Sequence, residues 1–68
     1  MNRTFGQNLK RERLQAGMSQ RELAALIGVK QQQLSQWECD KVEPTLSNIV
    51  AMLKELHVAF EDLVDELE

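Results

Sequence analysis

The stretch at 20–37 (QRELAALIGVKQQQLSQW) constrains this 68-residue chain most, because it predicts two short helices joined by a tight turn. Ser19 can cap the first helix, at about 20–27, and Glu22 three residues later completes a capping box. Gly28 is expected to end this helix in the left-handed conformation. Four apolar residues of the helix are predicted to face inward: Leu23, Ala24, Leu26 and Ile27.

The second helix, predicted at about 31–38, has two unlike sides. Leu34 and Trp37 share the side that is expected to join the core, and Ala24 on the first helix is small enough to let the two helices cross closely. The other side is polar and carries Gln31, Gln32, Ser35 and Gln36. Residues 19–38 therefore predict a helix-turn-helix motif, whose second helix can lie in the major groove of DNA.

The rest of the chain is also predicted to be helical. A helix at about 5–16 has Thr4 as its cap and Gln7 as the capping-box partner. A loop at 39–44 contains the only proline and leads to a fourth helix, which Thr45 can cap. The inward face of this fourth helix is predicted from apolar residues spaced three and four apart: Leu46, Ile49, Val50, Leu53 and Leu56.

His57 stands where a glycine would be expected to end the fourth helix, so a positive φ is predicted there. A fifth helix is expected at about 60–67. The sequence thus predicts a single all-α domain over 1–68, with five helices packed compactly. A domain this small seldom has more than about 3–5 kcal/mol of stability from one core, so we also expect a homodimer. The dimerisation region is predicted at about 57–68, through the apolar side chains Phe60, Leu63, Val64 and Leu67.

Composition argues against several other classes of protein. The chain has one cysteine, which excludes an internal disulfide and fits a reducing cytoplasm. Cys39 and His57 stand alone, so we expect no metal site, no cofactor and no enzyme activity. No apolar run approaches the roughly 18 residues of a membrane span, and no signal peptide is recognisable. The prediction is a cytoplasmic protein that does not act at a membrane.

The net charge of −3 is unusual for a DNA-binding protein, but the charges are unevenly distributed. Residues 1–41 contain seven Lys and Arg against four Asp and Glu, whereas residues 42–68 contain one against seven. A basic first part and an acidic second part would orient the molecule on a polyanion. The alternative is a chance asymmetry of a small domain.

These residues resemble the lambda-repressor-like helix-turn-helix family of Cro and XRE-type transcriptional regulators, over roughly residues 5–64. The segments that carry the resemblance are Gly17–Ala24 (GMSQRELA), Ile27–Val29, Gln31, Gln32, Leu34, Trp37, Glu38, Pro44–Leu46, Leu63 and Val64. Within such a fold, the helix-turn-helix pattern is a specific indication of DNA binding.

The chain departs from the family pattern at four places. Lys30 replaces the Ser or Thr that usually caps the second helix of the motif, and Cys39 and Asp40 replace a common Asn-Gly turn. Glu43 stands where some relatives carry a basic residue that reaches the minor groove, so no such contact is expected here. Ala59 replaces the usual cap of the last helix, which is therefore expected to fray.

The resemblance implies that the polar side of the second motif helix reads bases. A glutamine amide matches N7 and N6 of adenine, and a good bidentate pair is worth about 1–3 kcal/mol of discrimination. The candidate base-contacting residues are Gln31, Gln32, Gln36, Ser35 and Lys30. The alternative is that these side chains are only solvated.

Phosphate contacts are expected at the start of the first motif helix, where the backbone N–H of Gln20 and the helix dipole favour an anion. The further phosphate-contacting candidates are Arg21, Gln33, Lys41, Ser47 and Asn48. Arg13 lies on an otherwise inward stripe of its helix and needs a partner there. In relatives the matching Arg and Glu often pair, which implies a structural ion pair between Arg13 and Glu38.

The function that the resemblance implies is sequence-specific regulation of transcription, with repression as the expected outcome. A homodimer would bind double-stranded DNA at a two-fold symmetric operator, with half-sites about 34 Å apart. Two alternatives remain open: a restriction–modification controller protein, and an antitoxin that binds both DNA and a toxin protein. A polymerase subunit is a further possible protein partner.

Overall fold

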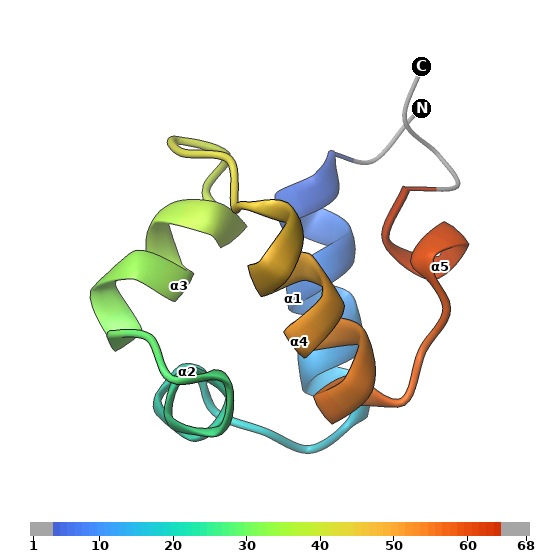
Figure 1. Ribbon diagram of the computed structural model, residues 1–68, viewed down its shortest axis with the longest axis horizontal. Helices are drawn as coiled ribbons and strands as arrows, with labels where there is room; N and C mark the ends of the chain where they lie inside the picture. The colour runs from blue at the N-terminus through green and yellow to red at the C-terminus, as the bar shows by residue number, and fades with distance from the viewer. Residues whose placement is uncertain (1–3, 65–68) are drawn as a thin grey trace.

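The computed structural model describes residues 4–64 and contains five helices and, within that range, no strand. The helices are α1 (Phe5–Gln15), α2 (Gln20–Ile27), α3 (Gln31–Glu38), α4 (Leu46–Leu56) and α5 (Phe60–Val64) (Figure 1). This arrangement confirms the predicted all-α class and the two helices of the motif. Residues 65–67 of the expected last helix lie outside the described part of the chain.

The helix ends follow the local sequence signals closely. The side chains of Thr4 and Ser19 cap α1 and α2, each in a complete capping box. Gly28 ends α2 at φ 78°, and His57 ends α4 at φ 58°, so both predicted left-handed positions are confirmed. Thr45 caps α4 by accepting from the backbone N–H of Asn48 at 3.3 Å. These interactions span four residues or fewer, which is why sequence alone could predict them.

The helices enclose one core to which each of them contributes. In Figure 1, α2 and α3 lie to the left of the longer helices α1 and α4, and α5 lies to the right. Helix α1 packs against α3 and α5, and α2 packs against α3 and α4. The buried apolar side chains are Leu9, Leu23, Ala24, Leu34, Trp37, Met52, Leu56 and Leu63. Leu34 and Trp37 thereby fix which side of α3 faces inward.

Three apolar residues that were expected to face inward are exposed instead. Leu26 is 53% exposed on α2, and Leu46 and Val50 are 73% and 47% exposed on α4. The buried side of α4 is turned toward Met52, which is fully buried and was not predicted. The prediction was wrong because apolar residues cover a wider arc of these helices than the small core can bury.

The last described helix is attached to α1 by two side chains. The Asn8 amide donates from Nδ2 to the Leu63 carbonyl at 2.7 Å, and Arg11 donates from Nη2 to the Asp62 carbonyl at 2.8 Å. The Leu63 side chain is fully buried, so its assignment to a dimer interface is wrong for this folded chain. Phe60 is half exposed and Val64 is half buried, and Leu67 lies outside the described residues.

Helix α1 approaches the end of α3 unusually closely at Gly6. A Cβ atom at Gly6 would lie 2.5 Å from the Glu38 carbonyl oxygen and 2.6 Å from that of Trp37. Both are backbone atoms, which cannot move aside as the end of a side chain could. The contact between α1 and α3 therefore requires glycine at this position.

Candidate nucleic-acid interface

The turn between α2 and α3 is a short, hydrogen-bonded connection. Gly28 donates its N–H toward Ala25, and Val29 donates to the Ala24 carbonyl at 2.9 Å. Ala24 is buried, as expected of a small residue where the two helices meet. Leu23 and Leu34, both fully buried, belong to the same core cluster. The turn and the core together set the angle at which α3 leaves α2.

Helix α3 presents its glutamines on an open surface. Gln31, Gln32 and Gln33 are exposed, and Gln36 is half buried, as is Ser35. The start of this side, at Gln31 and Gln32, is therefore accessible to solvent, and none of these side chains forms a hydrogen bond with another described residue. The amides are therefore free to donate and accept in pairs, which is the geometry that base edges require.

Lys30 begins α3 without capping it. Its backbone is extended, with φ −78° and ψ 148°, but its side chain makes no capping hydrogen bond. This is what a lysine in place of a Ser or Thr cap predicts. The exposed ammonium group lies at the same end of α3 as Gln31 and Gln32. It adds a positive charge to the surface on which these amides lie.

Arg13 and Glu38 form a salt bridge beneath the far end of α3. Arg13 Nε lies 2.6 Å from Glu38 Oε2, and Nη2 lies 3.1 Å from Oε1. Arg13 also donates from Nη1 to the Met18 carbonyl at 2.8 Å. Both charged residues are buried, at 6% and 8% exposure. This is the pair that the family resemblance implied, and it joins α1, α3 and the segment before α2.

Gln20 takes part in the same network. Its Nε2 donates to Glu38 Oε1 at 3.0 Å, which links the start of α2 to the end of α3. The sequence placed Gln20 at a phosphate but gave no indication of this contact, because the two residues are 18 positions apart. Its backbone N–H, at the first position of α2, has no hydrogen-bond partner among the described residues. That donor remains available to an anion.

The other candidate phosphate contacts lie on both sides of α3. Arg21 is exposed on the first turn of α2, and Lys41 is exposed in the loop that follows α3. Ser47 is exposed and Asn48 half buried on the first turn of α4, which the same loop joins to α3 (Figure 1). Arg21, Lys30 and Lys41 form no ion pair with another described residue. Their charges are thus not neutralised within residues 4–64.

An acidic residue also lies at the start of α2. Hydrogen bonds from the Ser19 backbone and side chain hold the pKa of Glu22 below its ordinary value of 4.5. Glu22 therefore stays ionised at neutral pH, where its carboxylate accepts the Ser19 N–H at 2.8 Å. Its role is to cap α2.

Sequence reasoning missed Asp40, which stands in the loop between α3 and α4. Its φ of 59° is left-handed, and its carboxylate accepts from the Gly6 N–H at 2.9 Å. The available signal was its place at the usual glycine of the family's Asn-Gly turn. That position predicts the backbone conformation, but the contact with α1 is visible only in three dimensions.

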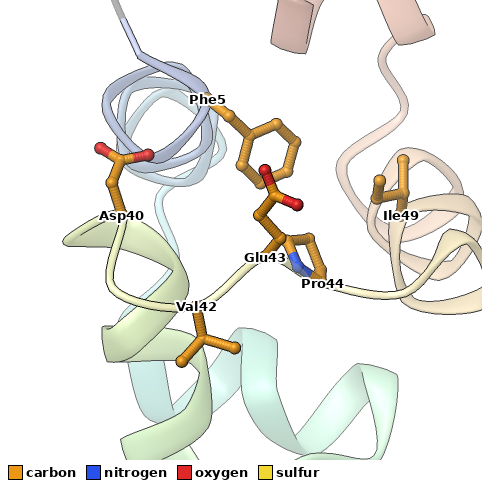
Figure 2. A pocket seen from close by; sticks show the side chains of 6 residues that line it. All are labelled: Phe5, Asp40, Val42, Glu43, Pro44 and Ile49. Carbon is orange, nitrogen blue, oxygen red and sulfur yellow. The ribbon is translucent and has the colours of Figure 1, made fainter.

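A hollow of about 380 Å³ lies beside this loop (Figure 2). Its lining consists of Phe5, Asp40, Val42, Glu43, Pro44 and Ile49. Two carboxylates and no cation line it, so it does not suit a phosphate. Within residues 4–64 no group of three or more possible metal ligands is found. None of the helices there has the length and apolar character needed to cross a bilayer.

The fold and the open face of α3 together define a helix-turn-helix DNA-binding domain. A model of the helix-turn-helix family matches residues 9–63. The chain therefore belongs to the Cro/C1-type helix-turn-helix family of DNA-binding transcription regulators. This family is not typically enzymatic. A search of curated proteins gives no match.

Solved structures support the same assignment. The P22 c2 repressor bound to a synthetic operator is similar at a TM-score of 0.86 and 26% identity, covering 94% of this chain and 97% of the repressor chain. The restriction–modification controller protein C.AhdI from Aeromonas hydrophila gives 0.82 and 30%, covering 87% and 89%. A hypothetical transcription factor from Neisseria gives 0.80 and 33%, covering 88% and 69%. The chain is thus a DNA-binding regulator of the repressor or controller type.

Proposed function

We propose that this protein is a transcriptional repressor that binds a two-fold symmetric operator as a homodimer and reads it with α3. The observation that carries the proposal is the division of α3 into a buried side, Leu34 and Trp37, and an open side of amides. Repression follows most simply, since a protein bound at a promoter excludes polymerase. The protein would act in the cytoplasm, where the nucleoid lies.

The residues proposed to contact bases are those of the first turns of α3 and the residue before it. Gln31, Gln32 and Gln36 would read base edges in the major groove, with Ser35 and Lys30 beside them. The phosphate backbone would be held by Gln20, Arg21, Gln33, Lys41, Ser47 and Asn48. Among residues 4–64, the N–H at the start of α2 has no hydrogen-bond partner and Arg21 and Lys41 form no ion pair, which supports this division of roles.

The proposed dimer would use the exposed apolar side of α5. Phe60 is 50% exposed, and Val64 is accessible in part. Molecular dimensions support the contact between copies. Half-sites one helical turn apart place equivalent points about 34 Å apart, and the chain measures 31 × 24 × 21 Å. Two copies on one face of the duplex would thus lie close together.

A restriction–modification controller is the second candidate. The observation that favours it is the 30% identity to C.AhdI over 87% of this chain. The two candidates share their DNA contacts and differ in the genes that the operator adjoins. Mapping the binding site in the genome would separate them: a site upstream of restriction and modification genes indicates a controller.

Selection of binding sites from random duplexes, at two salt concentrations, tests the proposal. The expected result is an inverted repeat with one half-site per helical turn, whose affinity falls steeply with salt. Equal binding to every sequence, or no binding in dilute buffer, would overturn the proposal that α3 reads bases.

A further inference from the structure

Asp40 follows α3 in the chain, yet its carboxylate is bound to the start of α1. Oδ1 accepts from the Gly6 N–H at 2.9 Å, and Oδ2 accepts from the Thr4 hydroxyl at 2.5 Å. Figure 2 shows the carboxylate beside the end of α1. Gly6 is in the first turn of α1, where a backbone N–H has no partner within its own helix. Asp40 therefore caps α1 from 34 residues away.

The same residue also ends α3. The Asp40 N–H donates to the Trp37 carbonyl at 3.1 Å, and the Lys41 N–H donates to the Gln36 carbonyl at 3.0 Å. These are the two hydrogen bonds of a Schellman motif, with Asp40 at the left-handed position. The backbone of Lys41 is thus set by the residue that is fixed to α1.

Beyond Lys41 the loop has little support of its own. No backbone hydrogen bond joins residues 42–44 to another described residue. Val42 is 45% exposed, Glu43 is exposed, and the hollow of about 380 Å³ lies beside them. The contact of Asp40 with Thr4 and Gly6 is therefore the anchor of this loop.

We propose that Asp40 is a positioning residue for DNA binding, which holds Lys41 at the end of α3 where its ammonium group can meet a phosphate. This inference rests on the proposed function, in which Lys41 contacts the DNA backbone. The close approach of Gly6 to the Glu38 carbonyl keeps α1 within reach of the Asp40 carboxylate. Asp40 itself touches no DNA in this proposal and acts through Lys41.

Two substitutions at Asp40 distinguish the role of its left-handed backbone from the role of its side-chain hydrogen bonds. Asp40→Gly accepts the left-handed conformation but removes the bonds to Thr4 and Gly6. Asp40→Asn keeps both bonds, since its amide can accept from the Gly6 N–H and donate to the Thr4 oxygen, and asparagine also tolerates positive φ. Glu43→Gln is the matched control, because it removes one negative charge from the same loop without removing a described hydrogen bond.

Operator affinity and its salt dependence are measured at a temperature where thermal unfolding shows each variant to be folded. Asp40→Gly is expected to weaken binding and to reduce the slope of log K against log salt by about 1, because one phosphate contact is lost. Asp40→Asn and Glu43→Gln are expected to bind at least as tightly as the wild type. A loss with Asp40→Asn equal to that with Asp40→Gly would overturn the proposal.

A double-mutant cycle with Lys41→Ala distinguishes positioning from a general loss of stability. If Asp40 acts through Lys41, Lys41→Ala weakens binding less in the Asp40→Gly background than in the wild type. The two fold-losses of affinity should differ by a factor of about three or more. Equal losses in both backgrounds would overturn the inference about Asp40. If Lys41→Ala has no effect in the wild type, the Lys41 phosphate contact of the proposed function is wrong, and the inference about Asp40 fails with it.

Discussion

Arg13 and Glu38 are joined by two hydrogen bonds inside the protein, with Nε 2.6 Å from Oε2 and Nη2 3.1 Å from Oε1. Removing one member leaves the other charge buried without its partner. Glu38→Ala is therefore expected to cost about 3–5 kcal/mol of unfolding free energy, measured by urea denaturation. Replacing Arg13 and Glu38 together with Met and Leu should cost less than either single change. A loss below about 1 kcal/mol in Glu38→Ala would show that the pair contributes little.

Gln31→Ala tests the proposed reading of bases. The exposed amide contributes no described contact to the fold, so stability should stay within about 0.5 kcal/mol of the wild type. Discrimination at one operator base pair should fall by about 1–3 kcal/mol, while non-specific binding is nearly unchanged. Gln15→Ala, at an exposed glutamine of α1, is the control. A uniform loss on all sequences would contradict base reading.

The proposed dimer predicts an effect of Phe60→Ser on association. Sedimentation of the wild type at micromolar concentration should show a dimer, and Phe60→Ser should shift it toward monomer, because Phe60 is half exposed and contributes little to the core. Leu46→Ser is the matched comparison, since Leu46 is the more exposed residue, at 73%. If Leu46→Ser dissociates the dimer and Phe60→Ser does not, the interface lies at the start of α4 and not at α5. A wild-type protein that remains monomeric on DNA would contradict the proposed dimer.

Gly6→Ala tests the close contact between α1 and α3. Alanine normally favours a helix by about 1 kcal/mol over glycine. Here its Cβ would lie 2.5 Å from the Glu38 carbonyl oxygen, so the backbones must separate. A net loss of about 1–3 kcal/mol is expected from thermal unfolding. Lys10→Ala, at an exposed position of the same helix, should change stability little. A stabilised Gly6→Ala variant would show that the helices can shift at low cost.

The lowered pKa of Glu22 predicts a small pH dependence of stability. Hydrogen bonds to Ser19 favour the carboxylate in the folded protein, so its contribution is present above the unfolded pKa of 4.5. It is lost as the pH falls through the lower folded value. The melting temperature of Glu22→Gln should therefore be below that of the wild type at pH 7, and the difference should shrink well below pH 4.5. A difference in melting temperature that does not change with pH would show that ionisation of Glu22 is not the cause.

The features that the sequence predicted correctly are local. Ser19 and Glu22 are three residues apart, and Gly28 follows the helix that it ends, so neither needs knowledge of the rest of the fold. The buried residues of α4 were harder to predict from the sequence, because the exposed Leu46 and Val50 continue the apolar stripe to which the buried Leu56 belongs. Only packing against the other helices shows that the stripe extends beyond the core.

At the candidate interface, too, the sequence predicted local features but not contacts between distant residues. The open side of α3 follows from periodicity, because Leu34 and Trp37 identify the buried side. The bond from Gln20 to Glu38 and the cap that Asp40 provides to α1 join distant parts of the chain. Leu63 could be read as core or as interface from its stripe, and the fold places it in the core.

The side chains of Gln31 and Gln32 take no part in the core or in the hydrogen bonds described within residues 4–64. The exposed side chains of Gln31 and Gln32 form no hydrogen bond with another described residue, whereas Leu34 and Trp37 on the opposite side are fixed in the core. Exchanging the amides should therefore leave the folded state almost unchanged. If these amides read bases as proposed, substituting them would redirect the protein to a different DNA sequence without a compensating change elsewhere in the fold.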